Sequence, residues 1–376
     1  MRAIIPRWTE ELAKDRWSES FVACKKYWPS RSTVEPRKGA QTMRNKRRAL
    51  LFAVFLFMAV SGDLWSQAPP TVAAKPTRAE TEILKSVVLI TVEANDPKDG
   101  RLVPIRGTGF LVAITDPRLT NYLFVYLVTN RHVAEAIEQD ERGNCKPWRV
   151  KKTYVTMNLK EPVNGNRADQ EQLTFSRQSH WYFPTDEAID LAVMPIVVNA
   201  KYELRVTFLD QFLTADILEK RQVVPGDRVL TGGYFYLYAE SQDFQPILRE
   251  GVLAMLPNEQ ITTTTCKPGK VYFADVHVIP GNSGSPMFVI PALPMNTGVS
   301  FGGAHNTFGL LGVVSGYMQE TEGLTLKASS SWKASIHSNS GISVIVPAQQ
   351  LKDLLESSEL KRMRDEAVER AIRSRR

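Results

Sequence analysis

The sequence predicts an all-β protein that is divided into two units and followed by a helix at its C-terminus. Short runs rich in Val, Ile, Leu, Tyr, Phe and Thr, bounded by Gly, Pro, Asn and Asp, recur from residue 86 to residue 347, as the strands of sandwiches and barrels do. There are more of them than one small barrel needs, and a helical-looking connection within 200–222 separates them into two groups. After Pro347 no such run occurs, and leucines recur at helical spacing.

The elements follow in chain order. The first group of expected strands covers residues 86–94, 103–114, 121–129, 152–159, 171–175 and 190–198, and the second covers 227–239, 251–256, 270–279, 309–318 and 341–347. The serine-rich stretch 327–341 predicts a mobile surface loop. Over 348–376 we expect one helix packed on the β units through Leu351, Leu354 and Leu355, followed by a solvated charged tail.

The N-terminal segment accounts for the basic character of the chain. The formal charge is +7, but residues 1–48 hold 13 Lys/Arg and 5 Asp/Glu, a net of +8, which leaves −1 for the rest. This distribution argues against nucleic acid as a partner. From Met43 a basic cluster, about a dozen apolar residues and a small polar tail follow one another, which is the plan of a secretory signal peptide.

The predicted organisation of the N-terminus is therefore a basic leader over 1–42, a signal peptide over 43–68 and a linker over 69–82. Met43 fits a true start, in which case the leader is not translated. The alternative is an uncleaved anchor formed by residues 49–62, although this apolar run is shorter than the roughly 20 residues of a membrane-spanning helix. A protein exported in this way is periplasmic or secreted, and only the anchor would bring it to a membrane.

The cysteines add little by themselves. Cys24 would be lost with the leader, and Cys145 and Cys266 either pair in an oxidising compartment or remain as free thiols. The chain has no C-x-x-C motif and no His/Cys cluster at metal-ligand spacing. We therefore expect neither a metal nor a cofactor.

Among the five histidines, His132 is the one best placed for chemistry, because in YLVTNRHVAEA it ends an apolar β run and enters a helical turn. Asp190 stands directly before LAVMPI, at the expected entrance of a buried strand. A desolvated carboxylate there needs a partner, and a histidine N–H is suitable. Asp186 competes with it, but its neighbours indicate an exposed turn. Each of these residues also fits a polar residue at a strand end.

The stretch VIPGNSGSPMF, residues 278–288, suggests a nucleophile at Ser283. Gly281 permits a backbone geometry in which its N–H and that of Ser283 point into one small cavity, where they could hold a developing negative charge. Gly284 lets the chain turn away without a Cβ in the substrate's path. The same G-x-S-x-G also marks α/β-hydrolases, but there the serine lies between a strand and a helix and its histidine follows it.

The order of the three candidates is informative. His132, Asp190 and Ser283 are separated by 58 and 93 residues, and His…Asp…Ser is the order of the chymotrypsin-type triad. With these motifs the chain resembles the bacterial trypsin-like serine proteases, in particular the HtrA/Deg proteases and the glutamyl endopeptidases. The matching pieces are RGTGFLV, LVTNRHVAEA, DEAIDLAVMPI, PGDRVLTGGY, PGNSGSPMF, LLGVVSG and GISVIVP, between residues 87 and 347.

This resemblance implies two antiparallel six-stranded barrels, about 83–200 and 222–347, with the active site between them. It implies His132 as general base, Asp190 as its orienter and Ser283 as nucleophile, with the N–H groups of Gly281 and Ser283 as the oxyanion hole. The implied function is an exported serine endopeptidase that acts on proteins or peptides through an acyl-enzyme. The alternatives are a catalytically inactive protease-fold binding module and a serine esterase.

The same resemblance places Ser315, Gly316 and Tyr317 on the strand that lines the primary specificity pocket, with Ser315 bonding the substrate backbone. His277 is expected near the base of that pocket. Ser285 stands where most relatives have glycine, and the segment 290–308 is longer than in most HtrA proteins. A C-terminal PDZ domain, which HtrA enzymes usually carry, is not expected in the 29 residues that follow Pro347.

Overall fold

The computed structural model describes residues 79–120, 122–139, 144–160, 170–175, 180–235, 245–262, 264–290, 308–327 and 331–374. The expected leader, the signal peptide, the linker up to residue 78 and segment 291–307 lie outside these residues. The described part of the chain contains no helix that is both long and apolar enough to cross a membrane.

The N-terminal half is built on an antiparallel sheet to which one parallel strand is added. Its strand order is β7-β6-β1-β2-β3-β8, and β9 pairs with β2. The strands are β1 (Val87–Asn95), β2 (Leu102–Thr115), β3 (Leu123–Thr129), β6 (Arg149–Asn158), β7 (Gln170–Phe175), β8 (Ala192–Ile196) and β9 (Val206–Phe208). Helix α3 (Ala79–Ser86) precedes the sheet and buries Ile83 in the core.

The prediction of a closed six-stranded barrel does not describe this half, because its described strands form a seven-stranded sheet whose order does not close. The length of β2 explains the extra strand. Strand β1 pairs with residues 102–110 of β2, and β3 pairs with residues 110–115 along the opposite edge of β2. The edge of β2 left open over residues 111–113 is taken by β9, which runs parallel to it. An unpaired strand edge would leave backbone groups without partners.

The C-terminal half is a closed six-stranded antiparallel barrel, as predicted. Its strand order is β10-β11-β14-β17-β16-β15. The strands are β10 (Arg228–Gly233), β11 (Ile247–Met255), β14 (Tyr272–Asp275), β15 (Pro286–Ile290), β16 (Gly309–Lys327) and β17 (Ser331–Pro347). The connection between the halves contains the 3-10 turn η1 (Leu209–Gln211) and helix α5 (Ala215–Lys220), which agrees with the expected helical linker.

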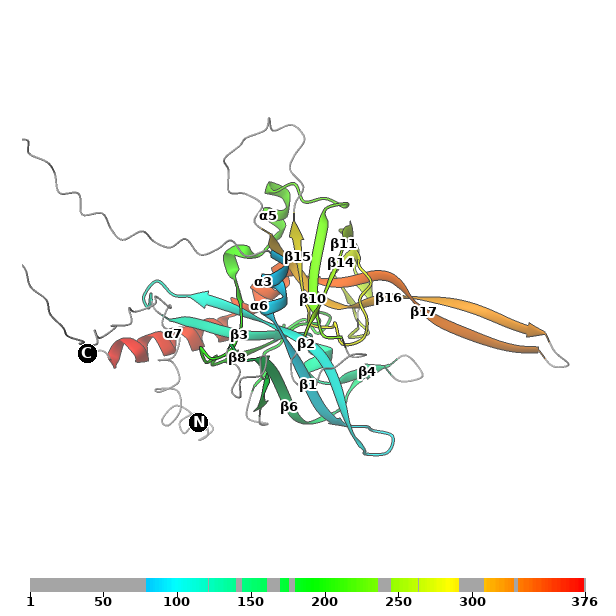
Figure 1. The fold of residues 1–376 in the computed structure, drawn as a ribbon, viewed down its shortest axis with the longest axis horizontal. Helices are drawn as coiled ribbons and strands as arrows, with labels where there is room; N and C mark the ends of the chain where they lie inside the picture. The colour runs from blue at the N-terminus through cyan, green and yellow to red at the C-terminus, as the bar shows by residue number, and fades with distance from the viewer. Residues whose placement is uncertain are drawn as a thin grey trace, which may run out of the picture. The chain divides into compact units, whose positions relative to one another are not determined.

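Strands β16 and β17 continue beyond the barrel as a long hairpin, which Figure 1 shows projecting from the body of the domain. Their pairing runs from Gly312↔Pro347 in the barrel to Lys327↔Ser331 near the tip. The prediction of a loop over 327–341 is therefore wrong for residues 331–341, which belong to β17. Serine-rich composition misled here because cross-strand hydrogen bonds join backbone groups and do not require apolar side chains.

Two helices follow the barrel, α6 (Ala348–Leu355) and α7 (Ser358–Arg373), where one helix and a solvated tail were expected. Helix α7 is held to the domain by Arg364, which is almost fully buried. Its Nη1 donates hydrogen bonds to the hydroxyl of Tyr126 on β3 and to the carbonyl of Leu355, both at 2.9 Å. A buried guanidinium needs such partners. Because α7 carries charged residues along most of its length, the sequence does not show which of them is buried.

Candidate active site

The site lies where the two halves of the domain meet, and His132 enters it from the end of β3. The short helix α4 (Arg131–Ala134) begins directly after Asn130, whose carbonyl accepts the N–H of Ala134 at 3.0 Å. The Asn130 side chain donates to the backbone carbonyl of Asp190 at 2.8 Å. These contacts join the turn that carries the histidine to the segment that carries the aspartate.

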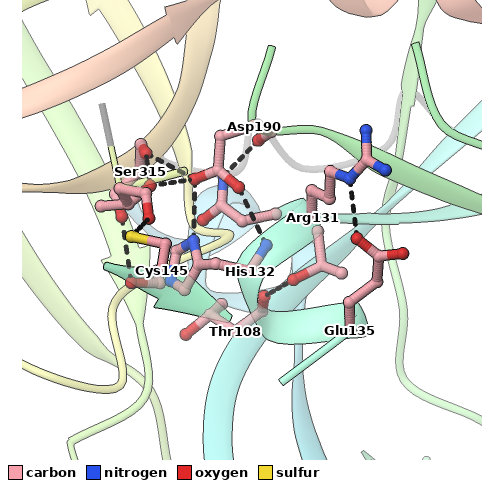
Figure 2. A network of polar contacts seen from close by, with 11 residues as sticks. Thr108, Arg131, His132, Glu135, Cys145, Asp190 and Ser315 are labelled. Carbon is pink, nitrogen blue, oxygen red and sulfur yellow. Dashed lines mark hydrogen bonds and ion pairs between the residues drawn. The ribbon is translucent and has the colours of Figure 1, made fainter. Parts of the chain in front are cut away.

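Asp190 is fully buried two residues before the start of β8, and it binds His132 twice (Figure 2). Its Oδ1 accepts the backbone N–H of His132 at 2.9 Å, and its Oδ2 lies 2.8 Å from His132 Nδ1. Protonation at Nδ1 leaves Nε2 as the basic nitrogen of a neutral imidazole. Asp186, the competing candidate, is exposed and caps the N–H of Ala188 at 2.9 Å.

The electrostatics of this pair favour its ionised form. Burial raises the pKa of Asp190. The charge of His132 and the hydrogen bonds from His132, Ser315 and Thr264 together lower this pKa by more than burial raises it, so the net pKa is below the ordinary value. Burial lowers the pKa of His132, but the charge and hydrogen bond of Asp190 outweigh it. With a smaller contribution from Glu138, the net pKa of His132 is raised.

Two hydroxyl groups complete the surroundings of Asp190. Ser315 Oγ donates to Asp190 Oδ2 at 2.5 Å, and Thr264 Oγ1 donates to the same oxygen at 2.6 Å. The two hydroxyl oxygens are 2.8 Å apart. Sequence reasoning assigned Ser315 to the specificity pocket and missed Thr264 altogether. The signal that could have drawn attention to Thr264 is the run TTTTC at 262–266.

The Ser283 turn is built from two successive tight turns. The N–H of Asn282 bonds the carbonyl of Ile279 at 3.0 Å, and the N–H of Ser285 bonds the carbonyl of Asn282 at 3.0 Å. The third residue of each turn is a glycine, Gly281 with φ +95° and Gly284 with φ +88°. A type II turn requires a positive φ at this position.

Thr108 of β2 fixes this turn against the N-terminal half. Its N–H donates to the carbonyl of Ser283 and its Oγ1 to the carbonyl of Gly281, both at 2.8 Å. Its own carbonyl accepts the hydroxyl of Thr129 at 2.8 Å. The geometry of the serine turn therefore depends on contacts with both halves of the domain.

Asn282 holds the same turn from within the barrel half. Its Nδ2 donates to the carbonyl of Tyr234 at 2.7 Å, and its Oδ1 accepts the N–H of Ile279 at 3.1 Å. Both ends of the amide are thus used, and the residue is buried. A neutral side chain meets the requirements of this site without a counter-ion.

Ser283 Oγ donates to the carbonyl of Ser315 at 3.2 Å. Because a hydroxyl carries a single hydrogen, this conformation directs it to Ser315 and not to His132. Catalytic hydrogen bonds are often formed only when substrate is bound. The structure therefore brings Ser283 into one network with Ser315, Asp190 and His132 without a direct hydrogen bond from Ser283 to His132.

The predicted specificity residues differ in their placement. Ser315 is fully buried, Gly316 and Tyr317 on β16 are half-buried, and His277 after β14 is exposed. The expected insertion at 290–308 falls largely outside the described residues. The substrate-binding roles of these four residues remain predictions.

The pairing of the cysteines, which the sequence left open, is decided by the fold. Cys145 on β5 (Cys145–Pro147) and Cys266 in the barrel half form a disulfide, with their Cα atoms 5.8 Å apart. The bond joins the two halves of the domain next to the site. In the described part of the chain, no group of His, Cys, Asp and Glu could hold a metal ion.

Comparison with known proteins shows similarity at the level of structure. No protein-family model and no curated protein matches the chain. A crystal structure of Deg5 is similar over 55% of this chain and 75% of its own, with 21% identity and a TM-score of 0.33. The closed six-stranded barrel and the Asp190–His132 pair beside it agree with the chymotrypsin-type fold that the motifs predict, except that the sheet of the N-terminal half does not close.

Proposed function

We propose that the protein is an exported serine endopeptidase, with Ser283 as nucleophile, His132 as general base and Asp190 as the residue that orients the base. The observation that carries this proposal is the contact between Oδ2 of the buried Asp190 and His132 Nδ1, 2.8 Å apart, at the junction that also holds the Ser283 turn. It fixes the tautomer in which Nε2 can take a proton.

Ser283 suits the role of nucleophile better than Ser315. Ser315 is fully buried and its hydroxyl is bonded to the Asp190 carboxylate, so neither substrate nor His132 Nε2 can use it. Ser283 is partly exposed, and its hydroxyl bonds only a carbonyl among the described residues. Rotation about its Cα–Cβ bond to another staggered rotamer would redirect that hydroxyl.

The chemistry follows from this assignment. Ser283 Oγ attacks the substrate carbonyl while His132 Nε2 takes its proton, and Asp190 stabilises the resulting imidazolium. The N–H groups of Gly281 and Ser283 stabilise the charge on the carbonyl oxygen. The imidazolium then protonates the leaving amine, and a water activated by His132 hydrolyses the acyl-enzyme. The backbone of Ser315, together with Gly316, Tyr317 and His277, would contact the substrate around the scissile bond.

The disulfide supports the part of the proposal that concerns export. The Cys145–Cys266 disulfide is of the kind that persists in secreted and periplasmic proteins. It agrees with the signal-peptide pattern at residues 43–68, which predicts delivery to the periplasm or the exterior. Protein or peptide substrates in that compartment are the partners that we propose.

Labelling with a fluorophosphonate tests the nucleophile. We expect the wild-type protein to be labelled, the Ser283→Ala variant to lose the label completely, and the Ser285→Ala and Ser315→Ala variants to keep it. Ser285 is a matched control, because it is a buried neighbour in the same turn. Label retained in Ser283→Ala would refute the assignment, and an unlabelled but folded wild type would favour a binding module. Comparison of peptide and ester substrates would then separate endopeptidase from esterase.

The pH dependence of kcat/KM tests the base. Attack requires neutral His132, and its pKa is held above the ordinary value by Asp190. We therefore expect activity to fall on the acid side with a midpoint above about 6.5. Glu138→Gln should move this midpoint to lower pH, because Glu138 also raises the pKa of His132. A midpoint at or below the ordinary histidine value would contradict the proposed pair.

A further inference from the structure

Among the described residues, the Asp190 carboxylate is bonded by His132 of α4, by Ser315 of β16 and by Thr264. Thr264 differs from the other two because it lies in a loop and not on a helix or a strand of the barrel. Its Oγ1 donates to Asp190 Oδ2 at 2.6 Å and lies 2.8 Å from Ser315 Oγ. It belongs to a turn between the strands β12 (Ile261–Thr262) and β13 (Pro268–Gly269) of the barrel half. The hydroxyl therefore reaches a carboxylate that is supplied by the other half of the domain.

This turn has little internal support. The β12–β13 hairpin contains two residues in each strand, paired as Ile261↔Gly269 and Thr262↔Pro268. A hairpin of this size is not stable by itself in water. In addition, Cys266 has a φ of +59°, which costs a residue with a Cβ about 1 kcal/mol or more. Contacts from outside the hairpin must hold the turn in place.

The disulfide is the strongest of these contacts. Cys266 stands two residues after Thr264, and its bond to Cys145 ties the turn to β5 of the N-terminal half. Cys145 Sγ lies 3.4 Å from the carbonyl oxygen of Thr264, so the covalent tie is in direct contact with the residue that binds Asp190. An ion pair between Lys267 and Glu187 joins the turn to the segment just before Asp190 at the exposed surface, where such pairs contribute little.

Packing fixes the orientation of the Thr264 side chain. A Cβ built on Gly316 would lie 3.1 Å from Thr264 Cγ2, so the methyl group sits close over the backbone of β16. With the methyl in this position, the hydroxyl of the same branched side chain is turned to Asp190 and Ser315. A β-branched side chain has few alternative rotamers.

We propose that Thr264 is a positioning residue for the Asp190–His132 pair and that the Cys145–Cys266 disulfide sets its position. The proposal rests on the proposed peptidase function for its kinetic consequences but not for its structural ones. Loss of the hydroxyl leaves Asp190 Oδ2 with fewer donors and frees the carboxylate to move. Loss of the disulfide releases the turn and has the same effect on Asp190 from a distance.

Substitution of Thr264 tests the first part. Thr264→Val keeps the shape and removes the hydroxyl, and we expect kcat to fall about tenfold with KM unchanged. Thr264→Ser should recover most of the activity. Thr262→Val is the matched control, because Thr262 is an exposed threonine of the same hairpin, and it should leave kcat unchanged.

The pKa of His132 supplies a readout that does not depend on turnover. The groups that act on it among the described residues are Asp190 and Glu138. A hydroxyl hydrogen beside Oδ2 offsets part of the negative potential that Asp190 exerts on the imidazole. We therefore expect Thr264→Val to raise the His132 pKa in an NMR titration, with His132→Gln to assign the resonance among the five histidines.

A double-mutant cycle tests the second part. The Cys145→Ser/Cys266→Ser variant should reproduce the effects of Thr264→Val on kcat and on the His132 pKa, and the triple variant should show no further change. If the serine variant does not fold, the wild-type protein can be reduced after folding. One disulfide then becomes two thiols while one dithiothreitol is oxidised to its cyclic disulfide, and circular dichroism confirms that the fold remains.

The outcomes are distinguishable. An unchanged His132 pKa in Thr264→Val, or additive effects in the cycle, would overturn the inference even if the wild type is labelled by fluorophosphonate. A lower melting temperature without a change in kcat or pKa would show that the disulfide only stabilises the fold, which also overturns it. If the wild type is not labelled, the proposed function fails, while the NMR titration still decides the link between the disulfide, Thr264 and Asp190.

Discussion

Replacement of Asp190 by Asn should lower kcat by about 10⁴-fold. The two carboxylate oxygens accept the backbone N–H of His132 on one side and three side-chain groups on the other, from His132, Thr264 and Ser315. An amide has one acceptor oxygen, so its NH₂ group must face a donor whichever way it is turned. If it faces Nδ1, the imidazole is forced into the tautomer whose Nε2 already carries a proton and cannot act as a base.

The same change should lower stability, because at least one buried donor loses its acceptor, at a cost of about 1–3 kcal/mol. Turnover of a peptide substrate and the free energy of unfolding in urea measure the two effects. Asp186→Asn is the control, since Asp186 is an exposed residue of the preceding turn, and it should change kcat by less than about twofold. If Asp190→Asn retained a tenth of the wild-type kcat, Asp190 would not be the partner of the catalytic base.

Substitution of Gly284 by Ala should inactivate the protein and destabilise the domain by more than about 3 kcal/mol. A Cβ at this position would lie 1.9 Å from the carbonyl oxygen of Thr108 and 2.4 Å from Thr129 Oγ1, and the φ of +88° is itself unfavourable for alanine. The first overlap is with backbone, so no side-chain rotation relieves it. Displacement of the turn would move Ser283, and a shift of about 1 Å at a reacting atom can cost about 10²-fold in rate.

Gly226 separates the two causes. Its φ is +101°, yet a Cβ there would meet no heavy atom within 4 Å, so Gly226→Ala reports the conformational cost alone, about 1–2 kcal/mol. The free energy of unfolding and kcat/KM should be measured for both variants. Equal losses of stability in the two would show that the contact with Thr108 does not hold the serine turn.

Much of the fold could be predicted from local sequence patterns. β-type runs bounded by turn residues identified most of the strands and their division into two units, because side-chain propensity and turn chemistry act over a few residues. The closed C-terminal barrel was expected from the resemblance that the motifs carry. The order of His132, Asp190 and Ser283 pointed to the site before any geometry was known. The errors occurred where long-range pairing overrides local composition, as in the serine-rich part of β17 and the charged helix α7 with its buried Arg364.

The environment of the site could not be predicted in the same way. Thr108, Thr264 and Asn282 have ordinary polar side chains, and their importance comes from the atoms that surround them. Their partners are distant in the sequence: Thr108 Oγ1 and Gly281 are 173 residues apart, and Thr264 and Asp190 are 74 apart. No pattern within a short window contains such pairs.

The sequence by itself determined the strand-rich class of the protein, the chymotrypsin-type order of the three candidate residues and the need for glycine at the serine turn, since these depend on residue type and local backbone geometry. Only the tertiary structure decided that the cysteines pair, that Ser315 and Thr264 bind the Asp190 carboxylate, and that the serine turn is held by both halves of the domain. The physical reason is that desolvation and hydrogen bonding depend on which groups meet in space, and folding alone brings these distant segments together.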